Sequence, residues 1–167
     1  MNIIQVCNSD IRGGAARAAY RFHRSLRRSG NSTLLRVVSA LSGDSTVEGP
    51  STKAEKALGI IRQQVESLPN HFLKTSNKVI HSSAFLSSVS LKELNFSEAD
   101  LVHLQWVNGG TMSIGDIGRI RKPVVWTLHD MWAFCGAEHY TEDERWRTGY
   151  RHDNRPDHES GFDLNRW

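Results

Sequence analysis

The chain has 167 residues, of which 38% are hydrophobic and 23% are charged, and its formal net charge at pH 7 is +3. This composition is typical of one folded domain, large enough to bury roughly 70% of the surface that its unfolded chain exposes. The mild basic excess disfavours nucleic-acid binding, because nucleic-acid binders usually carry a larger excess with aromatic residues interleaved.

Strands and helices are predicted to alternate along the chain. In chain order the predicted elements are strand 2–7, helix 15–28, strand 33–41, helix 52–68, strand 99–106, helix 113–120 and strand 122–130. The first helix ends at Gly30, the second ends before Pro69, and the third begins at Ser113 with Asp116 three residues on. Residues 42–52 have only turn chemistry and predict a mobile loop, whereas residues 70–99 predict loops with short elements.

This alternation predicts an α/β fold, a Rossmann-like parallel sheet with helices on both faces. We expect one domain over residues 1–140. Residues 141–167 are highly charged and show little apolar periodicity, which predicts a tail or a truncated linker. No run of apolar residues approaches the ~18 of a membrane span, and the N-terminus lacks the basic region of a signal peptide.

The two cysteines, Cys7 and Cys135, lie far apart and form no C-x-x-C motif. This spacing argues against a disulfide framework and favours a reducing compartment, so we expect a cytoplasmic protein. A cluster of arginines on the first helix either contacts anionic lipid or forms a solvated helix face. The cluster comprises Arg21, Arg24, Arg27 and Arg28.

Ligands of parallel α/β sheets bind beyond the carboxyl ends of the strands. The polar and glycine residues that follow three predicted strands should therefore converge on one site. These residues are 8–14, 105–110 and 129–139.

Gly13 and Gly14 mark the turn from the first strand into the first helix. They match neither the G-x-G-x-x-G dinucleotide fingerprint nor the P-loop, which disfavours nicotinamide cofactors and ATP hydrolysis. Backbone N–H groups at this helix start can still bind a phosphate, and Arg17 can add a charge one turn further on. The alternative is an ordinary tight turn, and this segment alone does not decide between the two.

The two later loops contain candidate ligand-binding residues. Trp106, Asn108, Gly109 and Gly110 suit a sugar or nucleotide, although an aromatic ring packed against a helix is the alternative, and His103 is expected in the core. His129 can donate to a hydroxyl or a phosphate oxygen, with Asp130 setting its tautomer. No serine or cysteine lies in a nucleophile-elbow pattern there, which disfavours covalent acyl chemistry.

The histidines and acids after residue 137 raise the question of a metal site. His139, His152 and His158 are separated by 13 and 6 residues, which fits no standard zinc pattern. A solvated loop is the expected structure, with a structural metal as the alternative.

Four blocks in this order resemble one family: RGGAARAAYRFHRSLRRSG, ADLVHLQWVNGG, KPVVWTLHDMWAFCGAEHY and ESGFDLNRW. The chain resembles the N-terminal half of bacterial family 4 glycosyltransferases from colanic acid, capsule and O-antigen clusters. The resemblance covers residues 1–167 and is weakest at 42–95.

The resemblance implies a GT-B architecture, in which two Rossmann-like domains face each other across a cleft. It implies retaining transfer of a hexose-type sugar from a nucleotide-sugar to a glycan or lipid-linked acceptor, with no metal ion required. It also assigns roles to residues of this chain. The donor diphosphate would lie at Gly13, Gly14 and Arg17, the catalytic residues would be His129 and Asp130, and the acceptor side would be Trp106, Asn108, Gly109, Gly110, Trp132 and His139.

Two departures from the family pattern limit these expectations. Gln105 occupies the position of a second histidine in many relatives, and the donor-binding C-terminal domain with its E-x7-E carboxylates is absent from the sequence. We therefore expect the isolated chain to bind a donor weakly and to transfer little. The alternatives are a non-catalytic glycan or nucleotide-sugar binding module and one half of a split enzyme whose C-terminal domain is encoded separately. Independently of these alternatives, arginines of the first helix could contact the inner membrane face.

Overall fold

The computed structural model describes residues 1–166, and the chain divides into two compact units. The first unit comprises residues 1–63 and 84–129, and the second comprises residues 64–83 and those from 130 onward. The expected boundary near residue 140 is therefore not where the compact units divide. None of the helices within residues 1–166 is long and apolar enough to cross a membrane.

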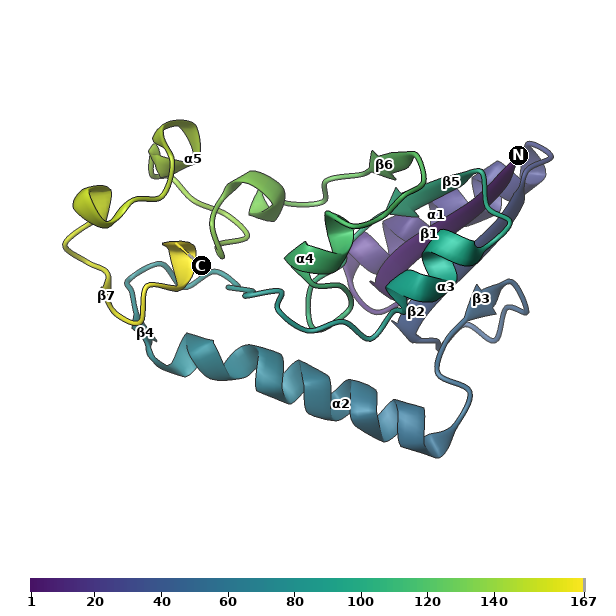
Figure 1. Ribbon diagram of the computed structural model, residues 1–167, viewed down its shortest axis with the longest axis horizontal. Coiled ribbons are helices and arrows are strands. Elements are labelled where there is room, and N and C mark those ends of the chain that lie inside the picture. The colour runs from purple at the N-terminus through teal and green to yellow at the C-terminus, as the bar shows by residue number, and fades with distance from the viewer. Residues whose placement is uncertain (167) are drawn as a thin grey trace. The chain divides into compact units, whose positions relative to one another are not determined.

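The first unit is built on a five-stranded, wholly parallel sheet with a Rossmann-like arrangement (Figure 1). Its strands are β1 (Asn2–Ser9), β2 (Ser32–Ser39), β3 (Val47–Glu48), β5 (Leu101–Leu104) and β6 (Val124–Trp126). Their order across the sheet is β3-β2-β1-β5-β6. The α/β fold predicted from the alternating elements is thus confirmed.

The central strand β1 pairs with a different strand on each side. Val6 lies opposite Arg36 of β2 and opposite Leu104 of β5. The chain first runs outward from β1 to β3 and then returns to β5 on the other side of β1. The strand order therefore reverses between β1 and β5, which is the switch point at which such sheets bind ligands.

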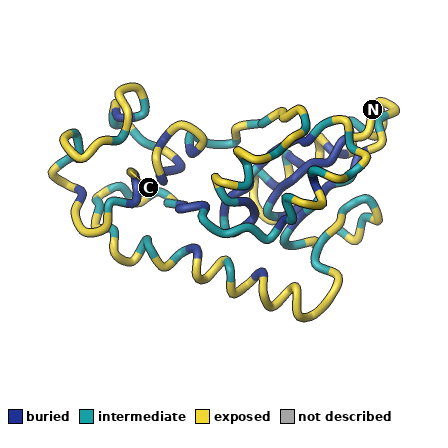
Figure 2. The backbone as a smooth tube through the Cα atoms, viewed as in Figure 1, coloured by how far each residue is buried: buried dark blue, intermediate teal, exposed yellow. Residues whose placement is uncertain are grey.

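Four helices lie between the strands of this sheet in the chain, and the first and third of them bury apolar side chains. The helices are α1 (Gly14–Arg28), α2 (Lys53–Ser67), α3 (Leu91–Phe96) and α4 (Ile114–Ile117). Ala19 of α1 packs with Cys7, Leu35 and Val37 in a buried cluster, and Leu94 of α3 is also fully buried. Figure 2 shows the buried residues concentrated in the strands.

The helix ends follow the predicted capping chemistry. The side chain of Ser113 accepts a hydrogen bond from the backbone N–H of Asp116 at the start of α4. Gly30 has a φ of +84° just beyond α1, and its N–H donates to the carbonyl of Arg27. This left-handed conformation is favourable mainly for glycine, which explains why α1 ends there.

Other elements differ from the sequence-based expectation. The predicted loop 42–52 contains β3, because Val47 and Glu48 pair with Leu35 and Arg36 of β2. This short strand depends on a partner distant in sequence, which local turn chemistry does not reveal. The predicted helix 52–68 matches α2 closely, but its apolar side chains are largely exposed, with Ile60 at 62% and Ile61 at 56% exposure.

The second unit has a different composition of elements. It contains the antiparallel pair β4 (Leu73–Lys74) and β7 (Ser160–Gly161), the helix α5 (Arg145–Thr148) and four single-turn 3₁₀ helices. The 3₁₀ helices are Leu68–His71, Trp132–Phe134, His152–Asn154 and Leu164–Arg166.

Residues 141–166 belong to this unit and are not a simple extended tail. Arg145 is buried and donates to both carboxylate oxygens of Glu159, at 2.6 and 3.1 Å, and to Asp143 at 2.6 Å. Such bidentate pairing compensates for the burial of the charges and holds separate turns together. Trp167, the last residue of the expected tail, lies outside the described residues.

Replacing Gly161 by alanine is expected to destabilise the second unit strongly. Gly161 has a φ of +75°, and a Cβ atom there would lie 2.1 Å from the carbonyl oxygen of Phe72. We expect a loss of at least about 3 kcal/mol in the free energy of unfolding, measured by urea denaturation. Gly149 is the matched control, because it has a φ of +86° but nothing within 4 Å of its Cβ position. Its replacement should cost about 1–2 kcal/mol, and equal costs would contradict the steric argument.

Candidate functional site

The loops that follow β1 and β5 are joined by the side chain of Asn8. Its Nδ2 donates to Thr111 Oγ1 at 2.9 Å and to the carbonyl oxygens of Asn108 and Gly109 at 3.3 and 3.4 Å. Its backbone N–H donates to the carbonyl of Trp106 at 2.9 Å. Two of the three predicted loops therefore meet at the carboxyl edge of the sheet, directly at the switch point.

The start of α1 forms an open surface beside this junction. Gly13 adopts a φ of +92°, has no side chain to cap the helix, and precedes a first turn without acidic residues. A Cβ atom at Gly13 or Gly14 would meet nothing within 4 Å. The positive end of the helix dipole is therefore not neutralised by an acidic residue of its first turn, and it favours an anion. Only Gly13 requires glycine for its backbone conformation.

Arg17 extends this surface by one helical turn. Its side chain is exposed, and its Nε donates to the carbonyl of Ile11 in the β1–α1 loop at 3.3 Å. The contact keeps the guanidinium near the loop. A second positive group thus lies near the helix start.

Asp10 holds the β1–α1 loop in place from inside. It is fully buried, and its carboxylate accepts hydrogen bonds from the backbone N–H groups of Ile11, Leu41 and Ser42 at 2.7–3.1 Å. Burial by itself would raise the pKa of Asp10, but hydrogen bonds from Ser42 and Leu41 outweigh it and hold this pKa below its ordinary value. Asp10 is thus an ionised anchor between two loops.

His129 is oriented by Gln105. Its Nε2 lies 2.8 Å from Gln105 Oε1, and because an amide oxygen only accepts, Nε2 carries the proton. The amide nitrogen of Gln105 lies 3.1 Å from His103 Nε2, so Gln105 stands between two imidazoles. The residue that departs from the family pattern therefore contacts the histidine expected to act in catalysis.

A buried polar network continues from His103 into the core. Gln5 contacts His103 Nδ1 at 3.3 Å and His23 Nδ1 at 3.1 Å, and His23 Nε2 contacts Thr46 Oγ1 at 2.7 Å. Burial lowers the pKa of both His23 and His103. The charge of His129 lowers the pKa of His103 further. Both buried rings are thus held toward the neutral form, and the prediction of His103 as a core histidine is confirmed.

The predicted acceptor residues after β5 differ from one another in position. Trp106 is partly buried and packs against the core cluster around Leu35. Asn108 and Gly110 are buried, and the Asn108 Nδ2 atom has no hydrogen-bond partner. Gly109 and Gly110 have φ values of +63° and +71°, so they serve the turn itself.

Three further predicted site residues belong to the second unit. Asp130 Oδ2 lies 2.6 Å from His139 Nδ1, and His139 Nε2 lies 2.9 Å from Ser82 Oγ. Trp132 donates through Nε1 to the carbonyl of Ser82, and its backbone N–H donates to Asp130. An acid, a histidine and a serine in contact, in this order, also form the triad of many hydrolases. Here, however, Ser82 and His139 are buried. We assign these contacts to holding segments 80–83 and 130–139 together.

The tail histidines do not form a metal site of the usual kind. Within residues 1–166, no group of three or more His, Cys, Asp or Glu side chains is placed to hold a metal ion. His152 and His158 are both exposed, but His139 is buried, so the expected solvated loop does not describe all three histidines.

Several residues of the site were not singled out from the sequence. Asp10 and Asn8 lay within the predicted loop but carried no motif, and Thr111 lay beyond the predicted glycine turn. Their only local signal is a polar side chain at the carboxyl end of a buried strand or just after it. Their roles depend on partners about 30 or 100 residues away.

Replacing Asp10 by asparagine should destabilise the first unit by about 1–3 kcal/mol, because an amide NH2 would face buried N–H donors. The pKa of Asp10 is lower in the folded state, so its contribution is complete above about pH 4 and is lost as the pH falls through the folded-state pKa. Urea unfolding between pH 7 and pH 3 should therefore show the variant and the wild type converging in acid. The exposed Asp157 gives the control, whose replacement should cost less than about 0.5 kcal/mol.

Comparison with known proteins adds no support to the family resemblance of the four sequence blocks. A scan against models of protein families, a search of curated proteins and a search of solved structures each found no match. A function for this site is therefore inferred from its residues, their geometry and the four sequence blocks.

Proposed function

We propose that this chain is the acceptor-side domain of a retaining, family 4-type glycosyltransferase. In this proposal a nucleotide-sugar is the donor, and a glycan or lipid-linked molecule of surface polysaccharide biosynthesis is the acceptor. A second Rossmann-like domain, in the same protein or in a separate chain, would supply the other wall of the cleft.

One observation carries the proposal. Helix α1, which follows the loop after β1, begins without a side-chain cap at the switch point of a parallel sheet. Gly13, Gly14 and the exposed Arg17 there form a surface suited to an anion, and the anion of a nucleotide-sugar is its diphosphate. The adjacent β5 loop brings the buried Asn108 amide, a donor without a partner. The two loops are joined through Asn8, whose side chain donates to the backbone carbonyls of Asn108 and Gly109.

The chemistry follows from where charge develops. When the bond from the sugar to the diphosphate breaks, negative charge grows on the departing phosphate, and N–H groups fixed at the start of α1 would stabilise it. The hydrogen bond to Gln105 Oε1 fixes the ring proton of His129 on Nε2. His129 would orient a hydroxyl of the transferred sugar. Asp130 stays a candidate for tuning the imidazole, although its hydrogen bonds go to His139 and Trp132.

The arginines of α1 support a membrane contact in the same proposal. α1 has no acidic residue, and Arg21, Arg24 and Arg28 are exposed. Within residues 1–166 none of these arginines forms an ion pair with a carboxylate. A basic face of this kind suits the anionic headgroups of an inner membrane that carries a lipid-linked acceptor.

Titration with uridine diphosphate tests the anion surface on the chain as it is. Amide NMR shifts should concentrate on residues 9–17, with a Kd of about 1 mM or weaker because one cleft wall acts alone. Replacing Arg17 by glutamine should weaken binding about tenfold, since it removes a charge-assisted contact. Replacing Arg28, an exposed arginine at the far end of the same helix, should leave binding unchanged. Shifts confined to other regions would contradict the assignment.

Sugar transfer requires a second test, with the complementary domain supplied in the same chain or in trans. His129→Ala should lower kcat/KM for transfer by about 10²–10⁴-fold, because it removes the group that orients the sugar at the reaction centre. Far-ultraviolet circular dichroism of the variant should match that of the wild type. A kcat/KM that stays unchanged would remove His129 from the mechanism.

A further inference from the structure

Glu138 of the second unit is a buried carboxylate with only half of its hydrogen-bonding capacity used. The residue is 1% exposed, and its Oε1 accepts a hydrogen bond from Asn77 Nδ2 at 2.9 Å. Its Oε2 is buried and has no hydrogen-bond partner. A buried carboxylate oxygen without a donor is costly, so it points to a group that this site is built to receive.

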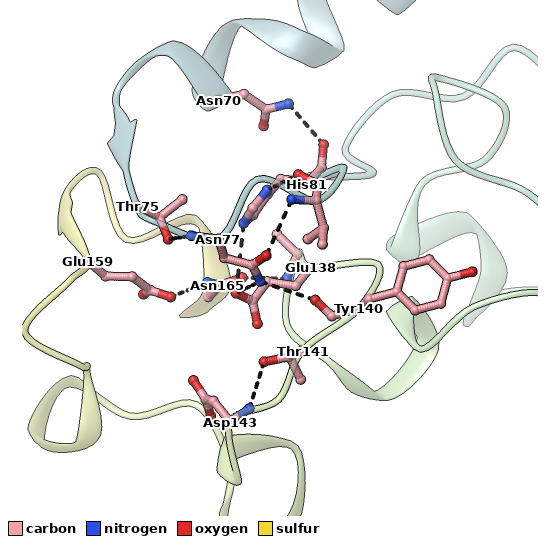
Figure 3. A network of polar contacts seen from close by, with 12 residues as sticks. Asn70, Thr75, Asn77, His81, Glu138, Tyr140, Thr141, Asp143, Glu159 and Asn165 are labelled. Carbon is pink, nitrogen blue, oxygen red and sulfur yellow. Dashed lines mark hydrogen bonds and ion pairs between the residues drawn. The ribbon is translucent and has the colours of Figure 1, made fainter.

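A second buried polar atom without a hydrogen-bond partner lies beside it. His81 Nδ1 lies 2.9 Å from the carbonyl oxygen of Val79 and donates to it. His81 Nε2 is buried without a hydrogen-bond partner and lies 3.9 Å from Glu138 Oε1. Glu138 Oε2 is thus an acceptor without a donor, and the group that complements it is a donor or a cation. Figure 3 shows these side chains together with Asn77.

Glu138 forms part of the wall of a pocket of about 400 Å³ within the second unit. The pocket is also lined by Asn77, Met131, Tyr140, Glu142, Asp143 and His158. Its volume is sufficient for one small ring, and Tyr140 is 54% exposed there.

The charges that line the pocket are unbalanced. Asp143 is neutralised by Arg145, whose Nε lies 2.6 Å from its carboxylate. Glu138 and Glu142 form no ion pair with a lysine or an arginine in the described part of the chain. Among the described residues that line the pocket, His158 carries the one basic side chain. The pocket therefore carries excess negative charge beside an aromatic ring.

We propose that this pocket binds a primary ammonium group, as carried by an amino sugar or by a cyclic amine. An ammonium group supplies three donors and a positive charge, which match Glu138 and Glu142, and the ring of Tyr140 favours a cation next to it. A metal ion fits less well, because no set of three ligating side chains is assembled among residues 1–166. This site does not depend on glycosyl transfer by the first unit.

Matched pairs of ligands test the proposal on the full chain by calorimetry or NMR titration. Glucosamine is compared with glucose, and cyclohexylamine with cyclohexanol, at about pH 7, where both amines are largely protonated. Both amines should bind at least about tenfold more tightly than their alcohol partners. Binding of glucosamine alone would identify an amino sugar as the carrier. Equal binding within each pair, or no binding of either amine, would overturn the proposal.

Variants locate the site. Glu138→Gln keeps the side-chain shape and should weaken amine binding about tenfold or more, because it removes the buried charge. Glu142→Gln, an exposed substitution on the pocket wall, should weaken binding by a smaller factor and carries the test alone if the Glu138 variant does not fold. Glu144→Gln is the control, since Glu144 is exposed in the same segment and does not line the pocket. Amine binding that both pocket variants leave unchanged would overturn the assignment.

Discussion

The parallel pairing of β1 with β5 is the constraint on which the candidate site of the first unit depends. It brings the loops after both strands to one edge of the sheet, where Asn8 binds the backbone of Asn108 and Gly109. The same pairing places Gln5 of β1 opposite His103 of β5. Without it, the start of α1 and His129 would share no scaffold, because they lie more than a hundred residues apart in the chain.

The sheet has a polar layer next to its apolar core. Gln5, His23 and His103 are buried and connected, and Gln105 extends the connection to His129. A network of this kind is stabilising only when its members are satisfied, and it then permits few alternative arrangements. The imidazole at the site is thus held by contacts that reach into the core. In the proposed function, this fixed orientation would supply the preorganisation that electrostatic stabilisation of a transition state requires.

The second unit is held together by different forces. Its buried apolar side chains are few, chiefly Trp132, Cys135, Ala137 and Leu164. Its turns are instead joined by buried charges and hydrogen bonds, such as Arg145 with Glu159 and His139 with Asp130. Several buried polar atoms of this unit have no hydrogen-bond partner, and the Oε2 of Glu138 is a carboxylate oxygen among them. The charged composition that predicted a tail is the same composition that builds this network.

Sequence alone determined the α/β class, most of the longer helices and strands, the glycine turn at Gly13 and the convergence of the β1 and β5 loops. These features follow from local periodicity, capping chemistry and the geometry of parallel sheets, which neighbouring residues encode. Tertiary structure alone decided that β3 forms, that Asp10 anchors the β1–α1 loop, that Gln105 orients His129, and that residues 141–166 fold with residues 64–83. Each of these depends on a pairing between residues distant in the chain. Such a pairing leaves no periodic signal, because only the folded chain brings the two partners together.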